Sequence, residues 1–178
     1  MQNAILDKLR AIPGVASAAF ANSLPMDGIT SNDPIYVEGR DADGPMPPIR
    51  RYKYVSPGLH AAMGTRFVAG RDISWPEIYE HRPVAMVSEN LARELFGSAA
   101  GALGKRISDA SRMQYREIVG VVENVRDNGL REAAPATVYW PTLSEKFYAN
   151  PIFVVRSVAF VIRSPRVGAG SFMAEVRQ

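Results

Sequence analysis

The Gly104-Lys105 pair is the part of this 178-residue sequence that comes nearest to a phosphate-binding motif. A phosphate loop has a glycine five positions before its second glycine, and Ser or Thr directly after the lysine. Here those positions hold Ala99 and Arg106. The expected context is also reversed, because the pair follows a helix and leads into a strand. We therefore interpret Gly104-Lys105 as a turn and expect no phosphate binding there.

The candidate nucleophiles and bases do not form catalytic patterns. Ser56, Ser88 and Ser98 are not framed as Gly-x-Ser-x-Gly, so a nucleophile elbow has no support. His60 and His81 lack the spacing of helical zinc-binding pairs, and a lone helical histidine is typical of a surface or packed residue. The chain has no cysteine, which excludes thiol catalysis and Cys-based zinc sites.

The carboxylates give no clearer signal. The segment Asp41-Ala42-Asp43-Gly44 lacks the third ligand position and the terminal Glu of a calcium loop, so we predict a turn. Glu77 and Glu80, or Asp127 and Glu132, could act as acid and base, but nothing in the sequence brings them into one pocket. Asp127 is expected in a solvated hairpin. We predict no catalytic, cofactor-binding or metal-binding residue, and no enzyme.

The charge distribution argues against nucleic-acid binding. The net charge of +3 comes from 21 basic and 18 acidic residues, which are scattered along the chain. A nucleic-acid binder usually carries a stripe of Lys and Arg on one face. Only Arg51 and Lys53 approach this, and they alternate with Tyr52 and Tyr54. That alternation predicts a half-buried strand.

The chain shows neither a membrane span nor a secretory signal. Its longest apolar run, Ile152 to Ile162, is interrupted by Arg156 and is shorter than the roughly 20 residues that a span needs. The first residues lead directly into an amphipathic helix, without the basic segment and apolar core of a signal peptide. For an exported domain, this pattern predicts a piece of a longer chain.

The first third of the sequence predicts one helix followed by three strands. Pro13-Gly14 ends a helix whose apolar face carries Leu6 and Leu9, and turn-forming residues separate the strands. The predicted elements are a helix over 2–12, strands over 15–24 and 35–39 and from 49 to 55, and a loop over 26–34.

A well-defined helix occupies the middle of the sequence. Ser88 is the expected N-cap, accepting a hydrogen bond from a first-turn amide, and Gly97 ends the helix in the left-handed conformation. Leu91, Leu95 and Phe96 should be buried against neighbouring strands. The other predicted elements are a helix over 58–63, strands over 66–69, 84–87, 104–107 and 118–122 and at 137–141, and a loop or one helical turn over 75–81.

The last 37 residues predict a loop, a strand and a helix. Residues 142–151 are polar and are expected to form a loop. Residues 153–162 are apolar on both faces, which predicts a central strand covered on each side. A helix should start at Ser171, with Phe172 and Val176 on one side.

The order of these segments resembles a known family. The matching pieces are VSPG at 55–58, AGRDI at 69–73, PVAMVSENLARELFG at 83–97, GKRI at 104–107, YREIVGVVENVRDNGL at 115–130, TVYWP at 137–141 and FVVRSVAFVIRS at 153–164. Over roughly residues 1 to 165, the chain is similar to the MacB-like periplasmic core domain of MacB/FtsX-type ABC-transporter permeases.

The resemblance implies an α+β fold, a two-lobed mixed α/β domain with an inserted β-rich lobe. Residues 1–75 and 145–178 would form a discontinuous α/β, porter-like lobe. Residues 76–144 would form the inserted β-rich lobe, with one helix.

The resemblance also implies a function without catalysis. Such a domain lies between two transmembrane helices of a permease in the bacterial inner membrane and faces the periplasm or the outside. It couples ATP hydrolysis in a cytoplasmic ATPase to substrate export or partner docking, together with a second permease copy. The isolated chain would then be a monomer without cofactors. The alternative is a stand-alone two-lobed ligand-binding or hydrolytic α/β domain with a cleft between its lobes.

Overall fold

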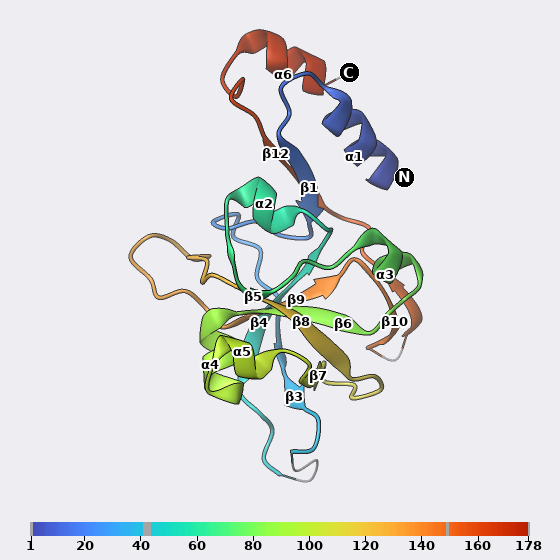
Figure 1. Ribbon diagram of the computed structural model, residues 1–178, viewed down its shortest axis with the longest axis vertical. Coiled ribbons are helices and arrows are strands. Elements are labelled where there is room, and N and C mark those ends of the chain that lie inside the picture. Colours follow the sequence, from blue (N-terminus) through green and yellow to red (C-terminus); the bar gives the residue numbers. More distant parts are fainter. Residues whose placement is uncertain (1, 41–43, 149, 178) are drawn as a thin grey trace.

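The structure, a computed structural model, describes residues 2–40, 44–148 and 150–177 (Figure 1). Within these residues, ten strands form one mixed sheet in the order β12-β1-β4-β9-β6-β8-β7-β3, with β2 beside β4 and β5 beside β8. The strands of this sheet are β1 (Ser17–Ala21), β2 (Asn32–Pro34), β3 (Tyr36–Val37), β4 (Ile49–Val55), β5 (Phe67–Gly70), β6 (Val84–Ser88), β7 (Arg106–Ser108), β8 (Arg116–Val122), β9 (Thr137–Pro141) and β12 (Ala159–Arg163).

The remaining elements are a two-stranded hairpin and six helices in the part of the chain that the structure describes. The hairpin consists of β10 (Leu143–Phe147) and β11 (Asn150–Val154). The helices are α1 (Gln2–Ala11), α2 (Leu59–Met63), α3 (Trp75–Tyr79), α4 (Glu89–Phe96), α5 (Ala99–Ala102) and α6 (Gly170–Val176). The α+β class is therefore confirmed.

One end of the molecule is built from the two ends of the chain. Helices α1 and α6 lie beside the β1/β12 ribbon at the top of Figure 1. β1 and β12 pair antiparallel from Ser17 opposite Arg163 to Ala21 opposite Ala159. Leu6 of α1 is fully buried in the cluster that joins this helix to the ribbon. Residues far apart in sequence thus form one local core.

The prediction of a central strand over 153–162 is wrong. Parts of two strands occupy this range. Phe153 lies in the hairpin strand β11, and residues 159–162 lie in β12, which is an edge strand of the main sheet. The amide of Val155 donates to the carbonyl of Thr142 at 3.0 Å, after which the exposed Arg156 interrupts the apolar run. A charged side chain cannot be buried unpaired in a sheet, so the chain leaves one sheet before it enters the other.

The prediction of a loop over 142–151 is also wrong. The β10/β11 hairpin fills most of this range because Phe147 points into the core, where it is fully buried. Its ring lies 5.4 Å from that of Trp140 and 5.5 Å from that of Tyr54, both in edge-to-face geometry. The polar residues around Phe147 conceal this one anchoring residue in the sequence.

Smaller differences occur near the loops of the first third. β2 lies inside the predicted loop over 26–34 and pairs with β4, while the predicted strand over 35–39 is reduced to β3.

Residues 75–79 form a helical turn, which is one of the two predicted options, because Ser74 and Glu77 make a capping box.

Helix α4 follows the prediction at its end but not at its start. Gly97 has φ +80° and closes the helix in the left-handed region, as predicted. Ser88 has the backbone of an N-cap, but its hydroxyl accepts from the amide of Thr137 at 2.8 Å and from no first-turn amide. Leu91 is fully buried, whereas Leu95 and Phe96 are only partly buried.

The division into two lobes stays a prediction. β4, from the first predicted lobe, runs parallel to β9, from the second, with Arg51 opposite Thr137 and Val55 opposite Pro141. The main sheet therefore joins both regions through backbone hydrogen bonds.

Candidate functional site

The three serines considered as nucleophiles, Ser56, Ser88 and Ser98, each bond to the backbone. The Ser56 hydroxyl accepts from the amide of Phe20 at 2.9 Å, and Ser88 bonds Thr137 as described above. The Ser98 hydroxyl accepts from the amide of Gly101 at 3.0 Å and so caps α5. Each hydroxyl is thus occupied by local structure.

The two histidines lie in different environments. His60 is buried, with its ring edge-to-face against Tyr139 and Phe67 at 4.7 Å and 5.6 Å, and neither ring nitrogen has a hydrogen-bond partner. Burial lowers the pKa of His60 to about 4, so it is neutral at pH 7. His81 lies with Nδ1 2.7 Å from a carboxylate oxygen of Glu145 in the hairpin. His60 is therefore a packed residue, as the sequence indicates.

The candidate acid–base pair Glu77 and Glu80 does not converge. Glu77 accepts two hydrogen bonds from Arg71, at 2.7 Å and 2.9 Å, which hold the pKa of its carboxyl at about 2. Glu80 pairs with Arg82 at 2.8 Å. Glu77 is therefore ionised near neutral pH and provides no proton donor there, and the two carboxylates are committed to different arginines.

Two sequence candidates remain, the Gly104-Lys105 pair and the segment Asp41-Ala42-Asp43-Gly44. Gly104 has φ +74°, and Lys105 is exposed at the turn into β7, as the turn interpretation requires. The segment Asp41-Ala42-Asp43 lies outside the described residues. Among the residues that are described, no group of three or more His, Asp or Glu side chains is placed to hold a metal ion.

Asp127 contradicts the prediction of a solvated hairpin. Its side chain is 4% exposed and accepts from Lys53 and Arg51, each at 2.6 Å. We call these three side chains the ion cluster. Lys53 is as deeply buried as Asp127, and its ammonium group also lies 3.5 Å from the carbonyl of Ser23. A buried charge needs such partners, because desolvation is otherwise costly.

The ion cluster also explains the alternating residues of β4. Arg51 and Lys53 point towards Asp127 on one face of the strand. Tyr52 and Tyr54 point to the other face, where their rings lie 5.4 Å apart. Tyr54 continues into the aromatic cluster around Phe147. The half-buried strand is confirmed, and the basic residues form no exposed stripe.

A hollow of about 440 Å³ lies above the ion cluster. Two loops form its walls, and the amide of Met26 in one loop donates to the carbonyl of Asp127 in the other at 2.8 Å. We call this feature the two-loop hollow. Its lining consists of residues 26–30, Arg51 and residues 127–129.

The charged side chains that line the two-loop hollow are Arg51, Asp127 and Asp27. Lys53, the third member of the ion cluster, pairs with Asp127 but does not line the hollow. The Nε atom of Arg51 is buried without a hydrogen-bond partner. On the wall, both carboxylate oxygens of Asp27 are engaged by amides of its own loop, those of Leu24 and Ile29. The sequence has no local signal for this arrangement, because its loops lie about 100 residues apart.

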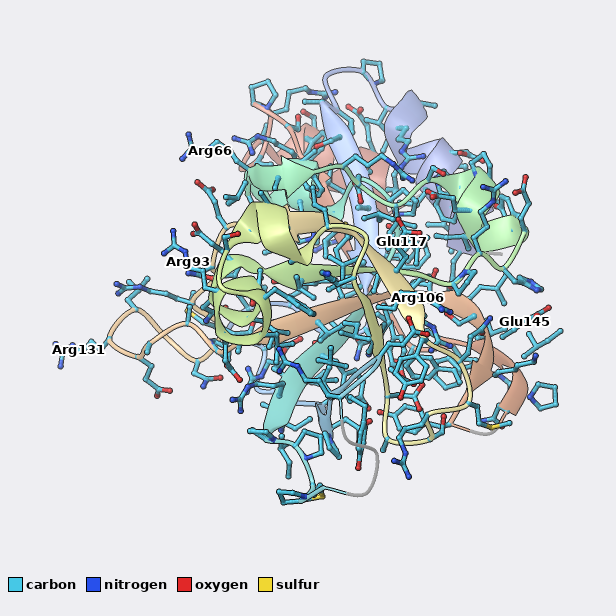
Figure 2. All side chains as sticks on the ribbon, turned by 60° about the horizontal axis from the view of Figure 1, so that its bottom comes forward. Arg66, Arg93, Arg106, Glu117, Arg131 and Glu145 are labelled. Atoms are coloured by element: carbon cyan, nitrogen blue, oxygen red, sulfur yellow. The ribbon has the colours of Figure 1, made fainter. Side chains whose placement is uncertain are left out.

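The loop that follows β8 and contains residues 127–129 protrudes from the body of the molecule. Figure 2 shows Arg131 at the tip of this loop, on the same side as Arg66 and Arg93 and opposite Glu145. Arg66 and Arg93 each pair with a glutamate, Glu123 and Glu89 respectively. Such exposed pairs contribute little to stability. The protruding loop is the feature that stands out on this side of the molecule.

Comparison with known proteins identifies a matching family and a shared fold. The model of the MacB-like periplasmic core domain family matches residues 2–172. Among curated proteins, no sequence matches the chain. No helix within the described residues has the length and apolar character needed to cross a membrane.

Three solved structures share the fold at low sequence identity. The periplasmic region of MacB from Actinobacillus actinomycetemcomitans has a TM-score of 0.61 and 13% identity, covering 98% of this chain and 70% of that one. The extracellular domain of the noncanonic ABC-type transporter YknZ from Gram-positive bacteria has a TM-score of 0.57 and 13% identity, covering 97% and 76%. A domain of a putative permease from Porphyromonas gingivalis has a TM-score of 0.53 and 22% identity, covering 90% and 67%.

Proposed function

The chain belongs to the MacB-like periplasmic core domain family, and from this membership we propose that it is the extracytoplasmic domain of an ABC-transporter permease. In this role it catalyses no reaction. It couples ATP hydrolysis by a cytoplasmic ATPase to substrate export or to the docking of a partner protein. The observation that carries the proposal is the family match over residues 2–172 of 178.

The positions of the first and last helices support attachment to a membrane. α1 and α6 lie at the same end of the molecule (Figure 1). Chain segments that continue from both helices would therefore reach the same membrane without crossing the domain. We place the domain on the outer side of the bacterial inner membrane, next to a second permease copy.

The continuous sheet supports a mechanical role. It runs from β12 and β1, near the two chain ends, to β7 and β3 at its other edge. Backbone hydrogen bonds and a close-packed core make such a sheet stiff, so a displacement at one end moves the other end. In this proposal, residues 1–75 and 145–178 form the porter-like lobe, and residues 76–144 form the inserted lobe.

The first test reads the gene that surrounds this segment. The proposal expects hydrophobic spans of about 20 residues on both sides of the domain. A reading frame without such spans would exclude a permease and favour the stand-alone ligand-binding or hydrolytic domain. Screening the isolated chain with esterase and phosphatase substrates then tests the absence of catalysis.

The second test measures coupling in the full-length permease with its ATPase in lipid vesicles. The chain has no cysteine, so Lys105→Cys introduces a single spin-label site in this domain at an exposed position. The distance between the labels of two permease copies should change when ATP is added. An ATPase variant that cannot hydrolyse ATP serves as the control. An unchanged distance with hydrolysis intact would rule out coupling through this domain.

A further inference from the structure

We propose that one end of the molecule binds the surface of a bilayer that contains anionic phospholipids. This end, which we call the helical end, consists of residues 2–16 and 163–177, including α1 and α6 (Figure 1). Lys8 and Arg177 would lie among the lipid phosphates, and Ile5, Val167 and Met173 would reach the boundary of the acyl chains. The choice of a membrane as the occupant rests on the proposed function, but the test needs neither the ATPase nor transmembrane helices.

The net charge of the chain is concentrated at the helical end. Residues 2–16 and 163–177 contain five basic and two acidic residues, a net charge of +3, whereas the rest of the chain contains 16 of each kind. The charged residues of the helical end are Lys8, Arg10, Arg163, Arg166 and Arg177, with Asp7 and Glu175. An anionic lipid surface attracts basic residues within about one Debye length. It therefore favours this end of the molecule over the rest, where the charges balance.

Most of this positive charge is not neutralised within the molecule. Of the five cations, only Arg166 forms an ion pair within the described residues, with Glu175 at 2.5 Å. Arg10 and Arg163 donate to backbone carbonyls, at 3.0 Å and 3.4 Å, and such bonds leave the positive charge in place. Asp7 is the remaining carboxylate of the helical end. Four cations against one carboxylate are thus available to attract anionic lipids.

Each of the two helices exposes an apolar side chain beside a basic one. In α1, Ile5 is 38% exposed, and the exposed Lys8 follows three residues later. In α6, Met173 is 41% exposed, and the exposed Arg177 follows four residues later, at the end of the helix. Residues three or four apart lie on the same face of a helix. Such faces are typical of helices at a membrane interface, where the charged group reaches the headgroups and the apolar group enters the acyl boundary.

The loop before α6 holds a third apolar side chain, Val167, at the surface. Val167 is 65% exposed. Its neighbour Arg166 donates to the carbonyl of Pro13 at 2.7 Å, pairs with Glu175, and lies 5.3 Å from the centre of the Phe172 ring. Arg166 therefore ties the loop both to the turn after α1 and to α6. A side chain that is already held in place loses less entropy when it enters a binding surface.

The first test measures how much of the isolated chain sediments with sucrose-loaded vesicles. The vesicles consist of phosphatidylcholine, either alone or mixed with about one third phosphatidylglycerol as the anionic lipid. At low salt, about half of the chain should sediment with roughly 10 mM of the anionic mixture, the strength expected of a few basic residues. Binding to phosphatidylcholine alone should be at least about fivefold weaker. Salt at about 0.5 M should release the chain, because it screens the attraction.

Charge-matched variants assign the binding to the helical end. Lys8→Gln and Arg177→Gln should each weaken binding by about fivefold, the contribution of one basic residue near the lipid surface. Lys105→Gln and Arg131→Gln remove the same charge from exposed positions on other parts of the molecule. These two controls should weaken binding by less than about twofold. All four side chains are exposed, so folding should be unaffected.

A fluorescent label tests whether the apolar side chains enter the bilayer. The chain has no cysteine, so Val167→Cys, Met173→Cys and Met113→Cys each accept one environment-sensitive label. With anionic vesicles, the emission of labels at 167 and 173 should shift to shorter wavelength. The label at 113, an exposed position between β7 and β8, should not shift. Soluble glycerol phosphate at the same phosphate concentration should shift none of them, because it offers negative charge without an apolar phase.

Several results would overturn the proposal. These are no sedimentation with the anionic vesicles, equal sedimentation with neutral ones, equal weakening by the charge-matched controls, or sedimentation without a shift at 167 and 173. A shift at these two positions when the chain is concentrated without vesicles would assign the surface to a second copy of the chain instead. The reading frame and the ATP-dependent distance that test the proposed function do not depend on these outcomes, so the two proposals can fail separately.

Discussion

The carboxylate of Asp127 lies 2.6 Å from the ammonium nitrogen of Lys53, and both side chains are almost fully buried although 74 positions separate them. The contact joins the loop after β8 to strand β4 in the middle of the sheet. It fixes the base of the protruding loop, on which Leu130 and Arg131 are exposed. This ion pair therefore links the middle of the sheet to the protruding loop.

Asp127→Asn should destabilise the chain. The substitution leaves Lys53 buried beside Arg51 without a carboxylate, and removing one partner of a buried pair costs about 3 to 5 kcal/mol. Urea denaturation measures the free energy of unfolding. Glu132→Gln, on the exposed part of the same loop, is the control and should change it by less than about 0.5 kcal/mol. A cost for Asp127→Asn as small as that of the control would show that the pair is open to water.

The sequence predicts local structure here better than it predicts long-range partners. The left-handed Gly97 and the strand over 49–55 follow from residue types and spacing alone. In contrast, nothing near Asp127 indicates that Lys53 and Arg51 will lie beside it. The hairpin at 143–154 has no local signal for a similar reason, since it depends on the contact of Phe147 with Trp140. Tertiary packing decides these positions.

Lowering the pH should destabilise the chain through His60. Its pKa is about 4 in the folded chain, against 6.5 for a free histidine, because burial disfavours the charged form. Below pH 6.5 the unfolded chain thus binds more protons. The His60 contribution is complete above pH 6.5 and is lost as the pH falls towards 4. At about pH 4.5 the loss should reach roughly 2 to 3 kcal/mol.

The measurement compares the original chain with His60→Phe by urea denaturation at several pH values. Carboxylates titrate in both proteins, so the difference between them isolates His60. The variant should gain stability relative to the original chain as the pH falls, and His60→Gln provides a second comparison if phenylalanine does not fit. A difference that stays constant between pH 7 and 4.5 would show that His60 is protonated without cost.

Gly120→Ala should disrupt the contact between β5 and β8. Gly120 lies opposite Gly70 in the ladder, and a Cβ atom at position 120 would lie 2.2 Å from the carbonyl oxygen of Arg71. Backbone must move to relieve this clash, at a cost of about 1 to 3 kcal/mol. Gly170→Ala is the control, because a Cβ there meets nothing within 4 Å. Equal midpoints of thermal unfolding for the two variants would contradict the close approach of the strands.

Leu91→Ala should cost more than Leu95→Ala, although both leucines lie on α4. Leu91 is fully buried against the strands, so its truncation leaves a cavity and costs about 2 to 5 kcal/mol. Leu95 is only partly buried, and the cost of its truncation should be near 1 kcal/mol. Urea denaturation of both variants gives the order. The reverse order would mean that α4 is rotated about its axis.

The isolated chain should be a monomer at micromolar concentration, even though we propose that two permease copies act together. Membrane helices would hold two domains at an effective concentration of roughly 1 mM, so a weak contact suffices there. Without that tether, the same contact dissociates in dilute solution. Light scattering at about 10 µM, far below the tethered concentration, should report the mass of one chain. A dimer that persists on further dilution would show that the domain itself drives pairing.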